Sequence, residues 1–145
     1  MRSGAGCDPD RTKIVNKGSS KAVDVSGGSR AAGANVIQRT DGGAPNQNWR
    51  FAPVGDGSHE IVSRNSVLLM DVSGGVTTDG ANIVQSSDNN VPSQRWTLVA
   101  TGNGYYKVKN VNSNDLLTVS SGGTQLVQST DTSADSQLWK MVNVD

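Results

Sequence analysis

The chain is poor in the residue types that most often carry catalysis or hold metals. Among its 145 residues there is one cysteine, Cys7, and one histidine, His59. A single cysteine excludes an internal disulfide bond and a metal site built on several thiolates, and one histidine supplies only one ligand. A nucleophile with a matching base cannot be assembled convincingly from this set. We therefore expect no catalytic residues, no bound metal and no cofactor.

Other absences exclude whole classes of partner. The 13 basic and 13 acidic residues are scattered along the chain, and without a basic stripe a nucleic-acid partner is not expected. No apolar run approaches the ~20 residues of a membrane span, so no membrane partner is expected. The first ten residues, "MRSGAGCDPD", lack the apolar core of a secretory signal peptide. We interpret residues 1–12 as an N-terminal extension, such as a linker remnant, and residues 13–145 as a single domain.

Aromatic side chains are also scarce, yet all three tryptophans occur in the same setting. Each follows a glutamine by two residues, in "NQNW" at 46–49, "SQRW" at 93–96 and "SQLW" at 136–139. Upstream, "NVIQRTD" at 35–41 recurs as "NIVQSSD" at 82–88 and "QLVQSTD" at 125–131. The tryptophans are 47 and 43 residues apart. The chain therefore contains three related units, at about 13–52, 59–99 and 105–142.

Each unit contains four short apolar stretches separated by Gly, Ser, Asn, Asp and Pro, a pattern that predicts short strands joined by turns. In the second unit we expect strands at 59–63, 68–72, 82–85 and 96–99. No apolar pattern of period 3.6 is long enough for a helix. The sequence therefore predicts an all-β fold of about twelve short strands in three four-stranded units.

The tryptophans suggest how these units pack. A lone four-stranded unit would leave strand edges unpaired and one apolar face in water, whereas three units around a pseudo-threefold axis can close a barrel. The three tryptophans would then anchor a shared core, each with a gross burial contribution of roughly 4–6 kcal/mol as an upper bound. The glutamine before each tryptophan can bond backbone groups of a neighbouring turn.

Three QxW motifs, each preceded by a "DVSGG"-like turn and a "VQ" strand, resemble the ricin-type β-trefoil lectins, also classed as carbohydrate-binding module family 13. The likeness covers about residues 13–142. It implies a β-trefoil with up to three shallow sugar sites, one in each unit, and non-catalytic binding of carbohydrate. Many members are appended to secreted glycoside hydrolases. The resemblance thus also implies an extracellular protein that is covalently linked to such a catalytic domain or accompanies one.

The resemblance implies which residues contact the sugar. In the family an aspartate just after the second strand accepts hydrogen bonds from sugar hydroxyls, and it matches Asp24 and Asp71. The third unit has Thr118 at this position. An alternative role for the two aspartates is to stabilise the turn by bonding the amides of the following "SGG".

Two further positions belong to the same implied site. A polar residue just before the QxW glutamine also contacts the sugar, and Asn46 matches it fully and Ser93 in part. The glutamines themselves, Gln47 and Gln94, would brace the aspartates.

The position of the sugar-stacking ring departs from the family pattern. It falls one residue after the "VQ" glutamine, where this chain has Arg39, Ser86 and Ser129. Arg39 can instead lie flat against a sugar or pair with the carboxylate of a uronic acid. We rank the first unit as the best site and the second next. The third lacks the aspartate and has a site-forming loop four residues shorter, which is typical of a vestigial site.

The expected partner is a polysaccharide that contains galactose, arabinose or xylose. A different function remains open at this level, because β-trefoils also serve as protein-interaction scaffolds such as protease inhibitors, and the missing rings fit a lineage that has lost sugar binding. The chain shows no long exposed apolar stretch that would mark such an interface, so carbohydrate binding is the leading hypothesis.

Overall fold

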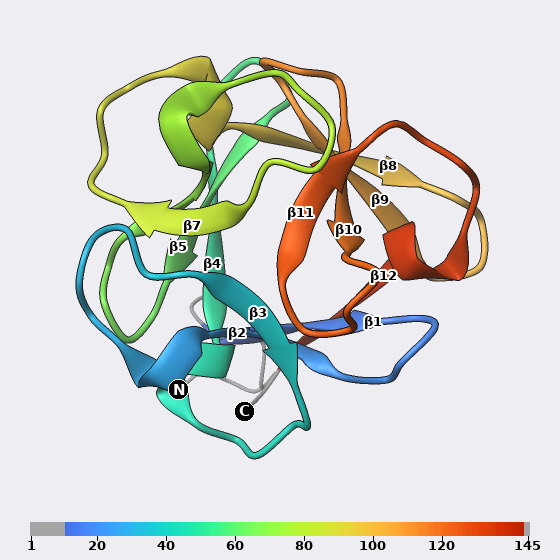
Figure 1. Ribbon diagram of the computed structural model, residues 1–145, viewed down its shortest axis with the longest axis horizontal. Coiled ribbons are helices and arrows are strands. Elements are labelled where there is room, and N and C mark those ends of the chain that lie inside the picture. The colour runs from blue at the N-terminus through green and yellow to red at the C-terminus, as the bar shows by residue number, and fades with distance from the viewer. Residues whose placement is uncertain (1–10, 144–145) are drawn as a thin grey trace.

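The computed structural model describes residues 11–143, which form short β-strands joined by turns (Figure 1). The strands are β1 Thr12–Asn16, β2 Ala22–Val25, β3 Val36–Arg39, β4 Trp49–Pro53, β5 His59–Ser63, β6 Leu69–Val72, β7 Ile83–Ser86, β8 Trp96–Ala100, β9 Tyr106–Asn110, β10 Leu116–Val119, β11 Leu126–Ser129 and β12 Trp139–Asn143. Single-turn 3-10 helices occupy η1 Ser26–Gly28, η2 Pro45–Gln47, η3 Ser73–Gly75, η4 Pro92–Gln94 and η5 Asp135–Gln137. No helix within the described residues is long and apolar enough to cross a membrane.

The expected secondary structure is confirmed, with small shifts at strand ends. In the second unit the strand expected at 59–63 is β5, and the stretches expected at 68–72 and 82–85 form β6 and β7, each displaced by about one residue. Cys7 lies outside the described residues, as does most of the extension expected at 1–12. We call β1–β4 the first lobe, β5–β8 the second lobe and β9–β12 the third lobe.

Six strands, the first and last of each lobe, close into a barrel. Five residue pairs join β4 to β5, five join β8 to β9 and five join β12 to β1, so the longest ladders connect different lobes. Within each lobe the first and fourth strands meet in one pair, at Thr12 and Trp49, His59 and Trp96, and Tyr106 and Trp139. Closure leaves no unpaired edge in this layer.

The remaining strands form three hairpins, β2–β3, β6–β7 and β10–β11, which lie around the centre of the view in Figure 1. Bridges between Asn35 and Val84, Ile37 and Gln125, and Asn82 and Val127 join them to one another. The side-chain amide of Gln125 donates to the carbonyls of Val36, Ile83 and Leu126, which are the first residues of β3, β7 and β11. This threefold arrangement confirms the β-trefoil predicted from the sequence.

The three tryptophans are fully buried in one core cluster, as expected. Each indole N–H also donates to a carbonyl of its own lobe's second strand: Trp49 to Val23, Trp96 to Met70 and Trp139 to Leu117, at 2.9–3.1 Å. These bonds satisfy the only polar atom of the ring in an apolar setting. The tryptophan therefore attaches the hairpin of each lobe to the barrel.

The turn between the first two strands of each lobe contains a residue with positive φ. The positions are Ser20, Val67 and Asn114, with φ of 62°, 64° and 64°, and each N–H donates to the carbonyl four residues before it. Asparagine tolerates this left-handed conformation, whereas a β-branched residue is strained in it. Val67 is 70% exposed, so it gains little burial in return.

Replacing Val67 with asparagine is therefore expected to raise the free energy of unfolding by about 1 kcal/mol, since it removes part of this strain. Urea unfolding followed by tryptophan fluorescence would measure the change. The matched control is Asn114→Val in the equivalent turn, which should lower stability by a similar amount. A stabilising effect of Asn114→Val would contradict the explanation.

Candidate functional site

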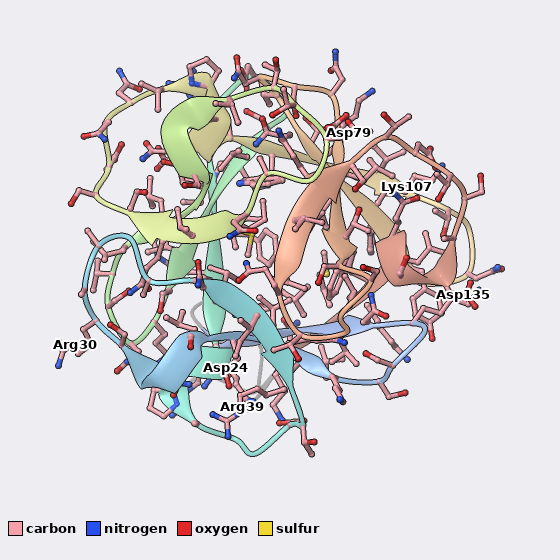
Figure 2. All side chains as sticks on the ribbon, in the orientation of Figure 1. Asp24, Arg30, Arg39, Asp79, Lys107 and Asp135 are labelled. Carbon is pink, nitrogen blue, oxygen red and sulfur yellow. The ribbon has the colours of Figure 1, made fainter. Side chains whose placement is uncertain are left out.

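The outer face of each hairpin presents the expected site residues. In the first lobe Asp24 pairs with Ile37 across β2–β3, and Ala22 pairs with Arg39. Because side chains alternate along a strand, Asp24, Ile37 and Arg39 share one face, with Arg39 diagonal to Asp24. Figure 2 shows Asp24 and Arg39 near each other at the lower edge of the molecule. In the second lobe Asp71 pairs with Val84 and stands in the same relation to Ser86.

The carboxylate of Asp24 is 2% exposed and is held by three donors. Its Oδ1 accepts from the backbone N–H of Val25 at 2.6 Å and from Nδ2 of Asn46. Its Oδ2 accepts from Nε2 of Gln47 at 3.1 Å. The backbone amides of the following "SGG" are not among these donors. The alternative prediction, that Asp24 stabilises the turn by bonding those amides, is therefore wrong. Asn46 and Gln47 fix the carboxylate, and one acceptor position of Oδ2 remains unused.

The QxW glutamine also holds the loop that follows the third strand. Nε2 of Gln47 donates to the carbonyl of Thr40 at 2.9 Å, and its Oε1 accepts from the N–H of Gly42 at 2.9 Å. Gln94 makes the equivalent bonds to Ser87 and Asn89. The expected bond to a neighbouring turn is therefore present, and the same side chain connects the core tryptophan strand to the site.

The second lobe has a more open carboxylate. Asp71 Oδ1 accepts from the N–H of Val72 at 2.7 Å, and Oδ2 accepts from Gln94 at 3.2 Å. Ser93, which replaces Asn46, is buried but does not bond Asp71. Two acceptor positions of Asp71 are thus unused, against one in Asp24. Asp71 therefore offers one more free acceptor position to hydroxyl donors than Asp24 does, and the ranking of the first unit ahead of the second stays a prediction.

Each of these two carboxylates lies at an open cleft. The cleft in the second lobe encloses about 510 Å³ and is lined by Asp71, Ser86 and Ser93, with Val72, Val91 and Asn89 among the others. The cleft in the first lobe encloses about 330 Å³ and contains Asp24, Arg39, Asn46 and Gln47. Both are within or near the range of small-ligand sites. The structure thus brings together the site residues expected in each lobe.

One group of cleft residues was not predicted from the sequence, because these residues come from the next lobe. Asn112, in the turn between β9 and β10 of the third lobe, lines the second-lobe cleft and donates to the carbonyl of Gly75 at 3.1 Å. Asn65 donates to Gly28 at 3.1 Å in the same way beside the first-lobe cleft. Asn65 and Asn112 are 47 residues apart and lie in equivalent turns. This spacing is the signal in the sequence that could have indicated their shared role.

The third lobe lacks the charged group of the other two. Thr118 takes the place of the aspartate, and Nε2 of Gln137 donates to its Oγ1 at 3.2 Å. The threonine hydroxyl in turn donates to the carbonyl of Leu116 at 2.8 Å. Ser129 occupies the ring position of this lobe. A neutral and internally bonded hydroxyl is a weaker acceptor than a carboxylate.

A pair of carboxyl groups lies outside these clefts, between the second and third lobes. Asp115 is 8% exposed, and its Oδ2 is buried without a donor. Burial, a hydrogen bond with Asp79 and repulsion from that carboxylate raise the pKa of Asp115 to about 6. Bonds from Asp115 and Thr130 lower the pKa of Asp79. Asp115 can donate to the carboxylate of Asp79 only when it is protonated, because two ionised carboxylates are both acceptors.

This pair predicts a pH dependence of stability. The folded state holds the proton of Asp115 more tightly than the unfolded chain, so its contribution is fully present below pH 3.8 and is lost as the pH rises to about 6. The lowered pKa of Asp79 affects stability only at pH values below this range. Asp115→Asn keeps a donor at every pH and should raise the free energy of unfolding at pH 7 by about 1 kcal/mol, after allowance for solvent screening.

Thermal unfolding measured from pH 4 upward would show a flatter profile for Asp115→Asn than for the wild type across this window. Asp56→Asn is the matched control, because the pKa of the Asp56 carboxyl is lowered by bonds from Ser58. Asp56→Asn should leave the pH dependence of the melting temperature in this range unchanged. The same slope in Asp115→Asn as in the wild type would contradict the raised pKa of Asp115.

Comparisons with known proteins agree with this architecture. A family model described as ricin-type beta-trefoil lectin domain-like matches residues 4–86 and 92–145. The designed threefold-symmetric protein ThreeFoil is 38% identical, with a TM-score of 0.90 over 95% of this chain and 99% of that one. The exo-β-1,3-galactanase 1,3Gal43A from Clostridium thermocellum is 34% identical, with a TM-score of 0.91 over 94% of this chain. The match spans 31% of the galactanase.

A third structure shows the fold alone. The Rhizoctonia solani agglutinin is 18% identical, with a TM-score of 0.82 over 99% of both chains. No curated protein sequence matches the chain significantly.

Proposed function

The chain belongs to the family of ricin-type β-trefoil lectin domain-like proteins, and from this premise we propose that it binds carbohydrate through its first and second lobes without catalysing a reaction. One observation carries the proposal: each of these lobes holds a buried aspartate, braced by the QxW glutamine, at an open cleft. Sugar hydroxyls are donors, and a charged acceptor forms shorter and stronger hydrogen bonds with them than a neutral one.

The second-lobe cleft also offers an apolar surface. Val91 lines it beside Ser86 and is 37% exposed. The apolar face of a sugar ring can rest on this side chain in place of a stacked aromatic ring. Aliphatic contact is weaker than stacking, so single-site affinity is expected to be near millimolar, about −4 kcal/mol. Two sites on one polymer would raise the overall affinity through effective concentration.

We further propose that the ligand is a polysaccharide containing galactose, arabinose or xylose and that the protein is extracellular. The similarity to part of an exo-β-1,3-galactanase supports a role attached to, or alongside, a glycoside hydrolase. In that role the domain would hold an enzyme close to its polymer. The whole enzyme's activity would then belong to the partner and not to this chain.

Removing the carboxylate charge is the direct test of the second-lobe site. Asp71→Asn is expected to weaken binding to a galactan or arabinoxylan about tenfold in that lobe, and the Asp24→Asn, Asp71→Asn double variant should lose measurable binding. Isothermal titration with oligosaccharides would measure the affinities. Folding should persist, because the third lobe carries an uncharged Thr118 at this position.

Asp88→Asn is the matched control, since Asp88 is an exposed turn residue of the second lobe and its Oδ1 accepts from the backbone N–H of Asn90 in the same turn. It should bind as the wild type does. Wild-type affinity in the double variant would show that the site is assigned wrongly. Absence of binding by the wild type to every neutral and acidic polysaccharide would overturn the proposed function itself.

A further inference from the structure

The loop between the second and third strands differs among the lobes. It comprises residues 26–35 in the first lobe and 73–82 in the second, but only 120–125 in the third. Each of these loops lies against the next lobe around the pseudo-threefold axis. The missing four residues therefore change the surroundings of the first lobe, which follows the third around the axis.

The "VQ" glutamines show how these loops are held. Gln85 donates to the carbonyls of Ser29 and Ala31 in the first-lobe loop, and Gln128 donates to Val76 and Thr78 in the second-lobe loop. Gln38 donates to one carbonyl of the third-lobe loop, Gly123. The shorter loop thus reaches less far over the neighbouring hairpin.

A hollow of about 420 Å³ lies between the first lobe and the shorter loop of the third lobe. Lys21, Arg39 and Gln38 line it from the first lobe, and Thr124 lines it from the third. It shares Gly27, Arg39 and Thr40 with the first-lobe sugar cleft. The two spaces are therefore adjacent, and Arg39 lines both.

The positive charge of this hollow is specific to the first lobe. Lys21 and Arg39 correspond to Leu68 and Ser86 in the second lobe and to Asp115 and Ser129 in the third. Both side chains are exposed, and neither forms a hydrogen bond or ion pair with the residues that the structure describes. The nearby carboxylate of Asp41 is already paired with Lys13 at 2.8 Å.

We propose that the first lobe binds an acidic sugar, a uronic acid, with one hydroxyl on Asp24 and its carboxylate on Arg39 and Lys21. This inference rests on the proposed function and gives the ligand class of one lobe. The planar guanidinium matches a carboxylate in a bidentate pair, and Lys21 adds a second charge. Asp24 has one unused acceptor position, enough for a ring that is held mainly through its carboxylate.

The register makes this arrangement feasible. Asp24 pairs with Ile37, and Arg39 is two residues farther along β3, so the two charged residues are diagonal neighbours at roughly 7–8 Å. One sugar ring can bridge that separation, with its hydroxyl edge toward the aspartate and its carboxylate toward the hollow. Ile37 lies between them and also lines the hollow, which gives the ring an apolar contact.

The experiment compares oligogalacturonate with a neutral galacto-oligosaccharide of the same length. Arg39→Ser, which installs the residue of the second lobe, is expected to weaken oligogalacturonate binding about tenfold and to weaken neutral binding at most about twofold. Added salt should weaken the acidic ligand more than the neutral one. Arg30→Ala is the matched control, because Arg30 is an exposed cation of the same lobe that points away from the cleft (Figure 2).

A second variant tests the role of the short loop. Replacing residues 120–125 with the ten-residue sequence of 73–82 should cover the hollow and reduce acidic binding, while the second-lobe cleft keeps neutral binding. Neutral but not acidic binding by the wild type would overturn this inference and leave the proposed function standing. Tighter binding of a sulfated galactan than of oligogalacturonate would overturn the carboxylate assignment. No binding of either ligand would contradict the proposed function.

Discussion

Trp96→Ala is expected to lower the free energy of unfolding by about 4 kcal/mol or more. The indole is completely buried in the core cluster, and truncation of a buried tryptophan costs about 3–5 kcal/mol through lost burial and the cavity left behind. The change also removes the donor to the carbonyl of Met70, which would stay buried and unpaired. With a typical domain stability of about 5–15 kcal/mol, this loss consumes much of the total.

Chemical denaturation followed by far-ultraviolet circular dichroism would measure the loss. Trp96→Phe is the matched comparison, because it keeps an apolar ring but not the N–H group, and it should cost about half as much. A loss under about 1 kcal/mol in the alanine variant would show that the tryptophan does not anchor the core.

The second large effect is expected from Gln85→Leu, at about 3 kcal/mol. Gln85 is fully buried and makes three side-chain bonds: it donates to the carbonyls of Ser29 and Ala31 and accepts from the hydroxyl of Ser66. Leucine fills a similar volume but leaves these groups without a partner, and each buried unsatisfied group costs about 1–3 kcal/mol. Because water partly reaches the loop, the expected loss is smaller than the sum of these costs.

Gln38→Leu provides an internal calibration for this prediction. Gln38 has two such bonds, to Gly123 and Ser19, because the loop that it faces is shorter. It should therefore lose less stability than Gln85→Leu when both are measured by urea unfolding. Equal losses in the two variants would indicate that the volume of the side chain, and not its bonds, sets the cost.

Much of the fold was predictable because the sequence repeats its own signals. The QxW motif occurs three times in register, so burial of Trp49, Trp96 and Trp139 could be inferred from their equivalence, and the turn formers between apolar stretches located the strands. The role of Gln38, Gln85 and Gln128 was not predicted. Alternation with the buried Val36 places Gln38 on the inner face, which is a usable signal, but its loop partner belongs to another lobe and sequence spacing does not show it.

The residues of the candidate site were likewise predictable only in part. The bond between Gln47 and Asp24 was implied by the family resemblance, and the structure contains it. Asn112 was missed because it reaches the second-lobe cleft from the next lobe. The shorter third loop is visible in the sequence, where it indicates only a weakened third site. The placement of Lys21 and Arg39 in one hollow beside this loop depends on the packing of one lobe on another, which the sequence does not show.

The strand ladders also determine how cooperatively the molecule should unfold. Each lobe shares five-residue ladders with its neighbours but closes on itself through a single pair between its first and fourth strands. In a linear array such as an ankyrin solenoid, repeats can fray from the ends, because each depends only on adjacent ones. Here the ring has no terminal repeat from which fraying could start. One sharp, all-or-none melting transition is the consequence, and a peptide of one lobe would gain order only by assembling as a trimer.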